Sequence, residues 1–263
     1  DIYQNDEFAR VHIDKANDIL SYDIKNIMFS GPEDVLKQTV HTQPAMFISS
    51  FVIGSILLSR GLKPACAAGH SLGEFSAFAL AGAFNFEDGL KLVKTRSEAM
   101  YEVGKKNPGT MAAVIGLSDE QIQNICSNYT DGIVCVANYN SPSQVVISGE
   151  ISAISDISSI LIEEGAIKVV KLNVSGAFHS PLMREAKDVL KEHLSSMNFE
   201  NTSFPVYTNL TSKPAYLISD IYEALLNQID NPVLWSKSIS KMVSDGINKG
   251  VEIGPSKVLQ GLT

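Results

Sequence analysis

One segment decides the fold: Pro64-Ala65-Cys66-Ala67-Ala68-Gly69-His70-Ser71-Leu72-Gly73-Glu74-Phe75. The apolar run at its start predicts a short strand, and the pattern Gly-x-Ser-x-Gly leads from that strand into a predicted helix. The glycines on either side of Ser71 leave room for a tight strand-to-helix turn that exposes the hydroxyl above a sheet. Such a serine attacks carbonyl carbons, so the segment predicts a nucleophile. Because the pattern is short, its meaning depends on the rest of the chain.

Length and composition indicate a globular protein with a sizeable core. The chain has 263 residues, enough for one large domain or two modest ones, and 44% of them are hydrophobic. The formal net charge of -8 argues against nucleic acid or an anionic membrane as the main partner, because both favour a basic surface. The longest apolar stretch, Ala45 to Leu58, is interrupted by serines and is too short to span a bilayer. We expect it to form a buried helix that opens at Thr42-Gln43-Pro44, and we expect no membrane partner.

The cysteines and the start of the chain bear on the compartment. Cys66, Cys126 and Cys135 are odd in number and lie in apolar surroundings, which is not the pattern of a disulfide framework. No Cys-x-x-Cys or His-x-x-x-His pair suggests a metal site. The chain begins at Asp1 without a signal sequence, and we expect an N-terminal strand to be missing. These features predict a soluble intracellular protein of the cytoplasm or of a plastid-type organelle.

A composition break at Lys105-Lys106-Asn107-Pro108-Gly109 separates two parts of the chain. After it the predicted order is strand, helix, strand, strand, helix, strand, which is that of a ferredoxin-like unit. These predicted elements are Met111 to Leu117, Ser118 to Tyr129, Ile133 to Ala137, Gln144 to Ser148, Ile151 to Glu164 and Lys168 to Leu172. A Ser118-x-x-Gln121 capping box opens the first helix. One further strand, Val251 to Ile253, is predicted near the C-terminus. We predict an α/β protein in which a large α/β-hydrolase-like domain with a mostly parallel sheet (1–108 and 176–263) carries an inserted ferredoxin-like small domain (109–175).

A serine nucleophile needs a base, and histidine is the side chain whose ordinary pKa lies near neutrality. His12 and His193 lie in polar helical patterns typical of a surface, and His41 precedes a helix start. His70 adjoins the nucleophile, but neighbouring side chains diverge on a sharp turn, so it is expected to line the pocket. His179 stands at the junction of the two predicted domains, just ahead of a proline-started helix. It is the preferred base.

Five motifs follow one another along the chain. They are Thr-Gln-Pro-Ala at 42–45, Gly-His-Ser-Leu-Gly-Glu at 69–74, Asn-Tyr-Asn-Ser-Pro-Ser-Gln-Val-Val-Ile-Ser-Gly at 138–149, Gly-Ala-Phe-His-Ser-Pro-Leu-Met at 176–183 and Glu-Ile-Gly-Pro-Ser-Lys-Val-Leu at 252–259. Together they resemble the malonyl-CoA:acyl carrier protein transacylase family over nearly the whole chain. The resemblance implies a ping-pong transfer of the malonyl group of malonyl-CoA to the phosphopantetheine thiol of acyl carrier protein, for fatty acid synthesis. It also implies a monomer with no tightly bound cofactor.

The resemblance assigns the catalytic roles. Ser71 is the nucleophile, and His179 serves as base and then as acid. The backbone carbonyl of Gln228 matches the third position, so the side chain of this residue is expected to matter little. The backbone amide of Leu72 matches one donor of the oxyanion hole. The other donor of the family belongs to a Gly-Gln-Gly-Ser-Gln segment that the sequence does not contain.

Further residues match substrate-binding positions. Arg96 matches a carboxylate clamp, whose planar guanidinium grips the malonyl carboxylate through two charge-assisted hydrogen bonds. Without the resemblance it would pass for a surface arginine on an amphipathic helix. Phe178 matches a bulky residue that disfavours a branched methylmalonyl unit. The other matches, which also fit core packing or turn formation, are His70, Met100, Met111, Asn138 and Asn140.

Two other functions share parts of this pattern. A serine esterase or thioesterase has the same turn but releases the acyl group to water. Two features argue against this alternative: no recognisable acidic motif lies between Ser71 and His179, and Arg96 favours transfer. A non-catalytic carrier-docking domain would have lost the serine or the histidine, and both are present. An acidic carrier protein needs a basic strip near the site, for which the candidates are Lys105, Lys106, Lys168, Lys171, Lys187 and Lys191.

Overall fold

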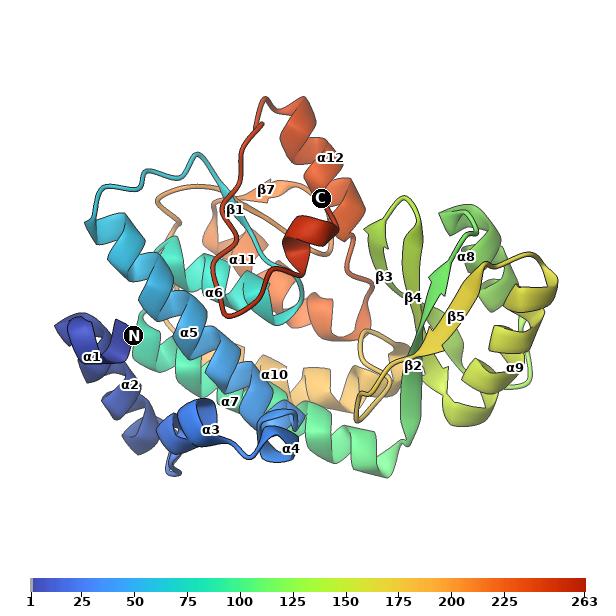
Figure 1. Ribbon diagram of the computed structural model, residues 1–263, viewed down its shortest axis with the longest axis horizontal. Coiled ribbons are helices and arrows are strands. Elements are labelled where there is room, and N and C mark those ends of the chain that lie inside the picture. The colour runs from blue at the N-terminus through green and yellow to red at the C-terminus, as the bar shows by residue number, and fades with distance from the viewer. Residues whose placement is uncertain (1) are drawn as a thin grey trace.

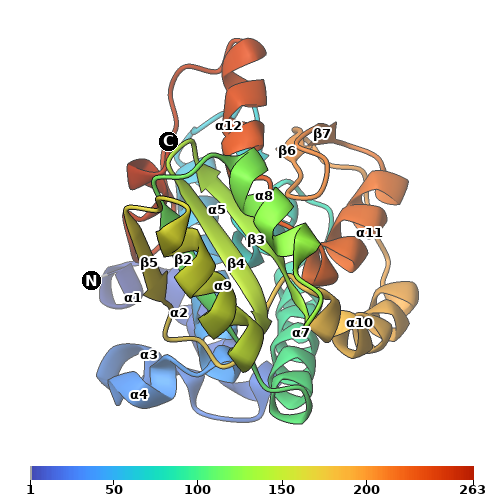
Figure 2. The ribbon, with the colours of Figure 1, turned by 90° about the vertical axis from the view of Figure 1, so that its right-hand side faces the viewer.

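The computed structural model describes residues 2–263 and consists of two parts that lie side by side (Figure 1). The larger part is mainly helical. The smaller part is a four-stranded sheet with two helices on one face, which stand in front of the sheet in Figure 2. The chain leaves the larger part once and then returns to it.

The first elements of the larger part are α1 (Ile2–Asn5), α2 (Glu7–Leu20), α3 (Ile24–Ser30), α4 (Glu33–Leu36), α5 (Thr39–Ser59), β1 (Ala67–Ala68), α6 (Leu72–Leu80) and α7 (Phe86–Lys106). The elements of the smaller part are β2 (Gly109–Ile115), α8 (Asp119–Asn128), β3 (Val134–Ser141), β4 (Gln144–Glu150), α9 (Ile151–Glu163) and β5 (Lys168–Lys171). The elements after the return are α10 (Arg184–Ser196), β6 (Val206–Tyr207), β7 (Pro214–Ala215), α11 (Ile218–Asn227) and α12 (Trp235–Ser244).

The sheet of the larger part is short and mixed. Its order is β1-β6-β7, where β1 and β6 are parallel and β6 and β7 are antiparallel. The prediction of a mostly parallel sheet is therefore wrong for the described residues. The protein is α/β with mixed sheets, and the buried core of the larger part comes mainly from its helices.

Helix α5 is the central helix of the larger part. Among residues 2–263 it is the one helix that is long and apolar enough to cross a membrane, and half of its most apolar window is buried inside the protein. It packs against α2, α6 and α7, and Phe47, Ile48 and Val52 enter the core there. Packing in the core accounts for its apolar composition.

Helix α5 begins at Thr39, one turn before its predicted start, so Pro44 lies inside it. A proline has no amide hydrogen, and the carbonyl four residues earlier therefore loses its helical donor. That carbonyl belongs to Val40, and the Tyr22 hydroxyl donates to it at 3.2 Å. A side chain from outside the helix thus replaces the missing bond.

The strands of the smaller part are antiparallel in the order β3-β4-β2-β5. Helices α8 and α9 cover one face and enclose an apolar core that includes Val114, Ile147 and Ile157. The predicted capping box of α8 is confirmed, because Ser118 Oγ accepts from the Gln121 amide while the Gln121 side chain accepts from the Ser118 amide.

Strand β3 continues to Ser141, past its predicted end. Asn138 and Tyr139 pair with β4 despite irregularities on either side, and the Tyr139 amide donates to the Val233 carbonyl at 2.9 Å. The turn is confined to Pro142-Ser143. The added strand residues tie the smaller part to the larger one.

Residues 251–253, predicted as a strand, form a loop. Ser50 Oγ donates to the Ile253 carbonyl at 3.4 Å. The Glu252 carboxylate accepts from the amides of Leu259 and Gln260 at 3.1 and 3.0 Å. Side-chain hydrogen bonds thus hold this segment in place of the expected strand pairing.

The turn between β1 and α6 is strained. Ser71 has φ 50° and ψ -109°, a combination that residues with a side chain rarely adopt. Gly69 permits the turn, because a Cβ there would lie 1.9 Å from the carbonyl carbon of Gly73. At Gly73 itself, no described atom beyond the adjacent residues and the backbone of its own helix lies within 4 Å of the Cβ position. Of the two glycines in the motif, close packing requires only the first.

We therefore expect Gly69→Ala to lower the free energy of unfolding by about 3 kcal/mol, since backbone atoms would have to move. Gly73→Ala is the matched control and should change it by less than about 1 kcal/mol, because alanine fits the helix. Urea unfolding followed by circular dichroism measures both. Equal losses for the two variants would contradict the packing argument.

Candidate active site

The structure brings Ser71 and His179 together from positions 108 residues apart in the chain, with Ser71 Oγ 2.8 Å from His179 Nε2. His179 has φ 56° and lies just before the short 3-10 turn Pro181–Met183. The Ser180 hydroxyl holds this loop by donating to the Ala177 carbonyl at 2.6 Å. The predicted nucleophile and the predicted base are thus within hydrogen-bonding distance.

A backbone carbonyl sets the protonation of His179. Nδ1 lies 2.9 Å from the Gln228 carbonyl oxygen. Because a carbonyl only accepts, Nδ1 carries the proton, and Nε2 is free to accept from the Ser71 hydroxyl. This is the arrangement of a general base on a serine, with a carbonyl in the place where many hydrolases have a carboxylate.

Burial and a nearby cation keep His179 neutral. The side chain is 4% exposed. Burial and the positive charge of Arg96 lower the pKa of His179 to about 3, while its hydrogen bond to Gln228 acts in the opposite direction. At neutral pH the ring is therefore unprotonated and able to take a proton. A negative charge that offsets Arg96 would raise this pKa and make the ring a stronger base.

Arg96 is a buried cation beside the nucleophile. It extends from α7, is 1% exposed, and donates from Nη2 to Ser71 Oγ at 3.1 Å. The side-chain oxygens of Gln43 and Gln228 accept from Nη1 and Nη2 respectively, and the guanidinium lies 5.1 Å from the centre of the Phe75 ring. Burial lowers the pKa of Arg96 to about 10, so it stays charged at neutral pH. Its Nε has no partner among the described residues.

The Gln228 side chain is also built into the site, although the resemblance leads us to expect only its backbone carbonyl to matter. This side chain is 1% exposed. Its Oε1 accepts from Arg96 at 2.9 Å. Its Nε2 donates to the Ser71 carbonyl at 2.9 Å and to a carboxylate oxygen of Glu74. One residue therefore contacts the base, the cation and the backbone of the nucleophile.

Comparison with known proteins shows the family of the chain. The acyl transferase domain family matches residues 1–262. Malonyl CoA-acyl carrier protein transacylase of Bacillus subtilis (strain 168) is 35% identical over 264 residues, which cover 100% of this chain and 83% of that protein. The chain belongs to this transacylase family.

Two solved structures of related proteins have a similar fold. An acyl carrier protein S-malonyltransferase from Vibrio cholerae superposes with a TM-score of 0.96 at 35% identity, covering 100% of this chain and 86% of that one. A malonyl-transacylase solved in complex with its type II polyketide synthase acyl-carrier protein superposes with a TM-score of 0.95 at 35% identity, covering 100% and 85%.

Three buried polar residues of this transacylase site are absent from the predictions. Glu74, fully buried on α6, accepts from the Asn209 amide at 2.7 Å. The Asn209 side chain accepts from the Ser71 amide at 2.7 Å and donates to the Gly69 carbonyl at 2.6 Å, which pins the strained turn. Gln43 on α5 accepts from the guanidinium. Glu74 and Gln43 lie inside two of the quoted motifs, whereas only its place after a strand singles out Asn209.

The smaller part of the transacylase reaches the site through β3. Asn140 Oδ1 lies 2.9 Å from His70 Nε2. The His70 ring also lies 5.8 Å from the Trp235 ring, and burial lowers the pKa of His70, which keeps it neutral. Asn138 is buried and bridges to Val233. His70 thus contacts both parts of the molecule. The histidine that is hydrogen-bonded to the nucleophile is His179.

The apolar candidates lie where the two parts meet. Phe178 packs against the large core and also against the small cluster that contains Met111. Met100 is buried on α7, and its sulfur accepts from Gln43 Nε2 at 3.4 Å. These contacts also fit ordinary packing, so the contact of these three side chains with substrate stays a prediction.

Leu72 is the first residue of α6. Amides in the first turn of a helix have no acceptor within that helix, and the helix dipole favours a negative charge there. This position suits a donor to an oxyanion, a role that stays a prediction for Leu72.

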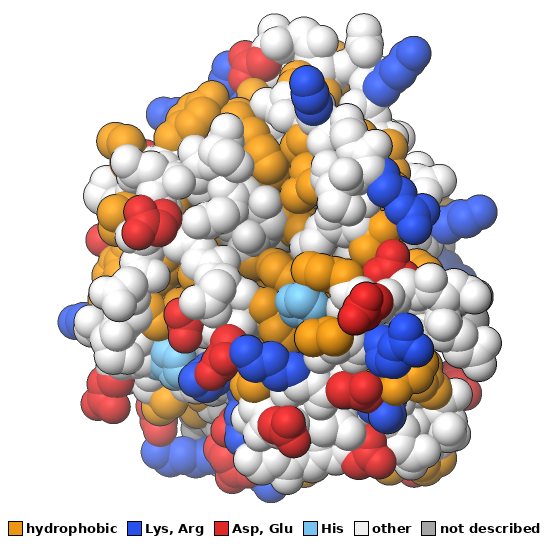
Figure 3. Space-filling view, turned by 90° about the vertical axis from the view of Figure 1, so that its left-hand side faces the viewer, with side chains coloured by type: hydrophobic (Ala, Val, Ile, Leu, Met, Phe, Trp, Pro, Cys, Tyr) orange, Lys and Arg blue, Asp and Glu red, His pale blue; other side chains and the backbone are white. Residues whose placement is uncertain are grey.

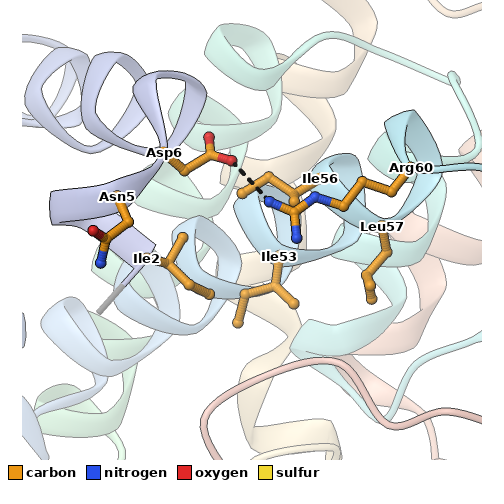
Figure 4. Close-up of a pocket in the computed structure, with 7 residues that line it drawn as sticks. All are labelled: Ile2, Asn5, Asp6, Ile53, Ile56, Leu57 and Arg60. Carbon is orange, nitrogen blue, oxygen red and sulfur yellow. Dashed lines mark ion pairs between the residues drawn. The ribbon is translucent and has the colours of Figure 1, made fainter.

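Two grooves elsewhere hold none of the predicted site residues. Hydrophobic side chains gather on the face shown in Figure 3. One groove lies between α1 and α5, where Ile2, Ile53 and Leu57 line it beside an Asp6–Arg60 ion pair of 3.6 Å (Figure 4). The other is lined by aromatic residues of α2, α5 and α7. Across residues 2–263 no group of three His, Cys, Asp or Glu side chains is placed to hold a metal ion.

The low pKa of His179 predicts the pH dependence of the nucleophile. Ser71 should react with uncharged phenylmethylsulfonyl fluoride at a constant rate as the pH falls through the ordinary histidine range near 6.5, because a pKa of about 3 keeps His179 unprotonated there. Arg96→Met removes the neighbouring positive charge and should move the loss of rate to higher pH. His179→Ala serves as control and should react slowly throughout. A wild-type decline centred near 6.5 would contradict this account.

Proposed function

We propose that this transacylase carries the malonyl group of malonyl-CoA to the phosphopantetheine thiol of an acyl carrier protein, for fatty acid synthesis. The observation that carries the proposal is the buried Arg96 guanidinium, 3.1 Å from Ser71 Oγ. An acyl group on Ser71 that ends in a carboxylate would meet this cation, whose Nε has no partner within residues 2–263. A planar guanidinium suits a carboxylate because it offers two parallel donors.

The first half of the reaction forms an ester on Ser71. Its oxygen attacks the thioester carbonyl carbon while its proton moves to His179 Nε2. The charge on the carbonyl oxygen develops next to the Leu72 amide, our proposed oxyanion donor. The carbon–sulfur bond then breaks, and His179 returns the proton to the departing sulfur of coenzyme A.

The second half reverses these steps with a new thiol. His179 takes the proton of the carrier's thiol, and the thiol sulfur attacks the ester carbonyl. The carbon–oxygen bond breaks, the proton returns to Ser71 Oγ, and the malonyl group leaves as a thioester. Protons and electrons balance over the cycle, so the protein ends as it began.

The charge of the substrate would help the base. Arg96 lowers the pKa of His179, and a malonyl carboxylate bound to Arg96 would offset that charge. The imidazolium formed during proton transfer would then be less unfavourable. Acyl groups without a carboxylate lack this effect, which is a physical reason for malonyl preference in addition to binding.

Hydrolysis is the less favoured alternative. A hydrolase would gain nothing from a buried arginine held against its nucleophile by Gln43 and Gln228. Such a cation attracts a carboxylate that acetyl and other simple acyl esters do not have. The geometry therefore favours transfer of a dicarboxylic acyl unit.

The carrier is proposed to dock through exposed lysines. Three of the six candidates already form ion pairs, namely Lys105 with Glu102 (3.0 Å), Lys106 with Glu185 (2.6 Å) and Lys187 with Asp230 (3.1 Å). The first two pairs are exposed, and exposed pairs contribute little energy. The Lys187–Asp230 pair is more buried. Lys168 and Lys171 are exposed on the edge strand β5, and we propose them as further contacts.

We also propose that the smaller part is a ferredoxin-like domain (109–175) inserted into an α/β-hydrolase-like large domain (1–108 and 176–263). The order β3-β4-β2-β5 with two helices on one face supports this. We further propose a soluble cytoplasmic monomer without a tightly bound cofactor. The net charge of -8 fits a soluble protein.

Mass spectrometry after mixing with malonyl-CoA tests the function. We expect a malonyl adduct on Ser71 that moves to the thiol of an added acyl carrier protein. His179→Ala should form the adduct about a hundredfold more slowly, because general base catalysis is lost. Release of the adduct as free malonate, with none on the carrier, would instead indicate a hydrolase.

Arg96→Lys tests the choice of acyl group. Lysine keeps the charge but loses the planar pair of donors, so kcat/KM for malonyl-CoA should fall about tenfold or more. The rate with acetyl-CoA should change much less, and the preference for malonyl should relax. Steady-state rates with both thioesters measure this, and an unchanged preference would contradict the clamp.

A further inference from the structure

Glu74 is a buried carboxylate that the transfer reaction described above does not use. It lies on the first turn of α6, three residues after the nucleophile, and is fully buried. Its Oε1 accepts from the Asn209 amide at 2.7 Å, and its Oε2 accepts from the Gln228 side-chain amide. Both oxygens thus act as acceptors, as the oxygens of a carboxylate do. Burial raises the pKa of Glu74 to about 7, while the hydrogen bonds from Asn209 and Gln228 and the charge of Arg96 act in the opposite direction and favour the ionised form.

We propose that Glu74 is a positioning residue for malonyl transfer, acting on Arg96 through the Gln228 amide. This inference rests on the proposed function. Glu74 touches neither the nucleophile's hydroxyl nor the guanidinium by any hydrogen bond in the described part of the chain. Its effect is exerted by fixing which end of the Gln228 amide faces the cation.

The two ends of an amide side chain differ: the nitrogen only donates and the oxygen only accepts. In its ionised form Glu74 selects the nitrogen end, because a carboxylate cannot donate. The Ser71 carbonyl, 2.9 Å from the same Nε2, makes the same choice. The oxygen of Gln228 is therefore left facing Arg96 Nη2 at 2.9 Å. A flipped amide would set donor against donor at Arg96 and acceptor against acceptor at Glu74.

The indirect contact has a physical advantage for substrate binding. A guanidinium buried without any negative charge nearby would be costly. A carboxylate in direct contact would reduce that cost but would occupy the donors that the malonyl carboxylate needs. With the Gln228 amide between them, the ionised form of Glu74 interacts with the charge of Arg96 and still leaves Arg96 Nε without a partner among the residues described.

Glu74→Gln provides the test, because it keeps the size of the side chain while replacing one acceptor by a donor. With its oxygen on the Asn209 amide, the substituted side chain would turn its NH2 toward the Gln228 NH2, and the relay to Arg96 would break. We expect the rate of Ser71 malonylation by malonyl-CoA to fall about tenfold or more, the usual effect of losing a hydrogen bond to a charged group. Acetylation by acetyl-CoA should fall less than about threefold.

Two controls separate positioning from general loss of structure. Phe78→Leu removes core packing from the same helix without touching the relay, so it should lower the unfolding midpoint and leave the malonyl-to-acetyl ratio unchanged. In an Arg96→Met background, Glu74→Gln should change the ratio little further, because both substitutions act on one interaction. Additive effects, or an equal fall for both acyl groups, would overturn the proposal.

The outcomes also separate this inference from the proposed function. If the wild-type protein forms no malonyl adduct, the proposed function fails. If the wild type is malonylated and Glu74→Gln keeps the same acyl ratio, only the positioning role fails. Should Glu74→Gln not fold, Gln228→Met removes the relay at its other end. It must show the same selective loss, and a loss equal for both acyl groups would overturn the proposal.

Discussion

The buried positive charge of Arg96 is the constraint on which the rest of the site depends. An arginine that is 1% exposed needs acceptors and a compensating charge. Gln43 and Gln228 supply the acceptors. Glu74, on the other side of the Gln228 amide, supplies a compensating negative charge in its ionised form. The same cation lowers the pKa of His179 and contacts the nucleophile. The choice of substrate and the state of the base therefore follow from one buried group.

The nucleophile is held in a strained conformation by several independent contacts. Ser71 at φ 50° would relax without them. Asn209 fixes the turn on both sides, by accepting from the Ser71 amide and donating to the Gly69 carbonyl. The absence of a side chain at Gly69 allows the helix to approach. The strain thus persists because neighbouring atoms leave the turn no alternative.

The sequence predicts the structure correctly where the signal comes from residues close together in the chain. The Gly-x-Ser-x-Gly turn, the capping box at Ser118 and the alternating strands of the smaller part depend on residues a few positions apart. Helix α5 begins one turn before its predicted start. A proline such as Pro44 normally marks a first turn, and the compensating hydroxyl of Tyr22 comes from another part of the chain.

The polar network was harder to predict for the same reason. Gln228 meets Arg96 across 132 residues and Glu74 across 154, and a buried amide or carboxylate leaves no periodic pattern in the sequence. Its members can be recognised in advance only through motifs. Asn209 gives no local signal, because its partners Ser71 and Gly69 lie 138 and 140 residues away in the chain.

The carbonyl that orients His179 is best understood from the same charge balance. A carboxylate at His179 Nδ1 would strengthen the base, but it would also place a second anion near Arg96 in a site from which water is largely excluded. The malonyl carboxylate would then have to bind against that anion. A neutral carbonyl from Gln228 orients the ring without adding charge. The negative charge that strengthens the base can then come from the substrate itself, so proton transfer becomes easier when the correct acyl group is bound.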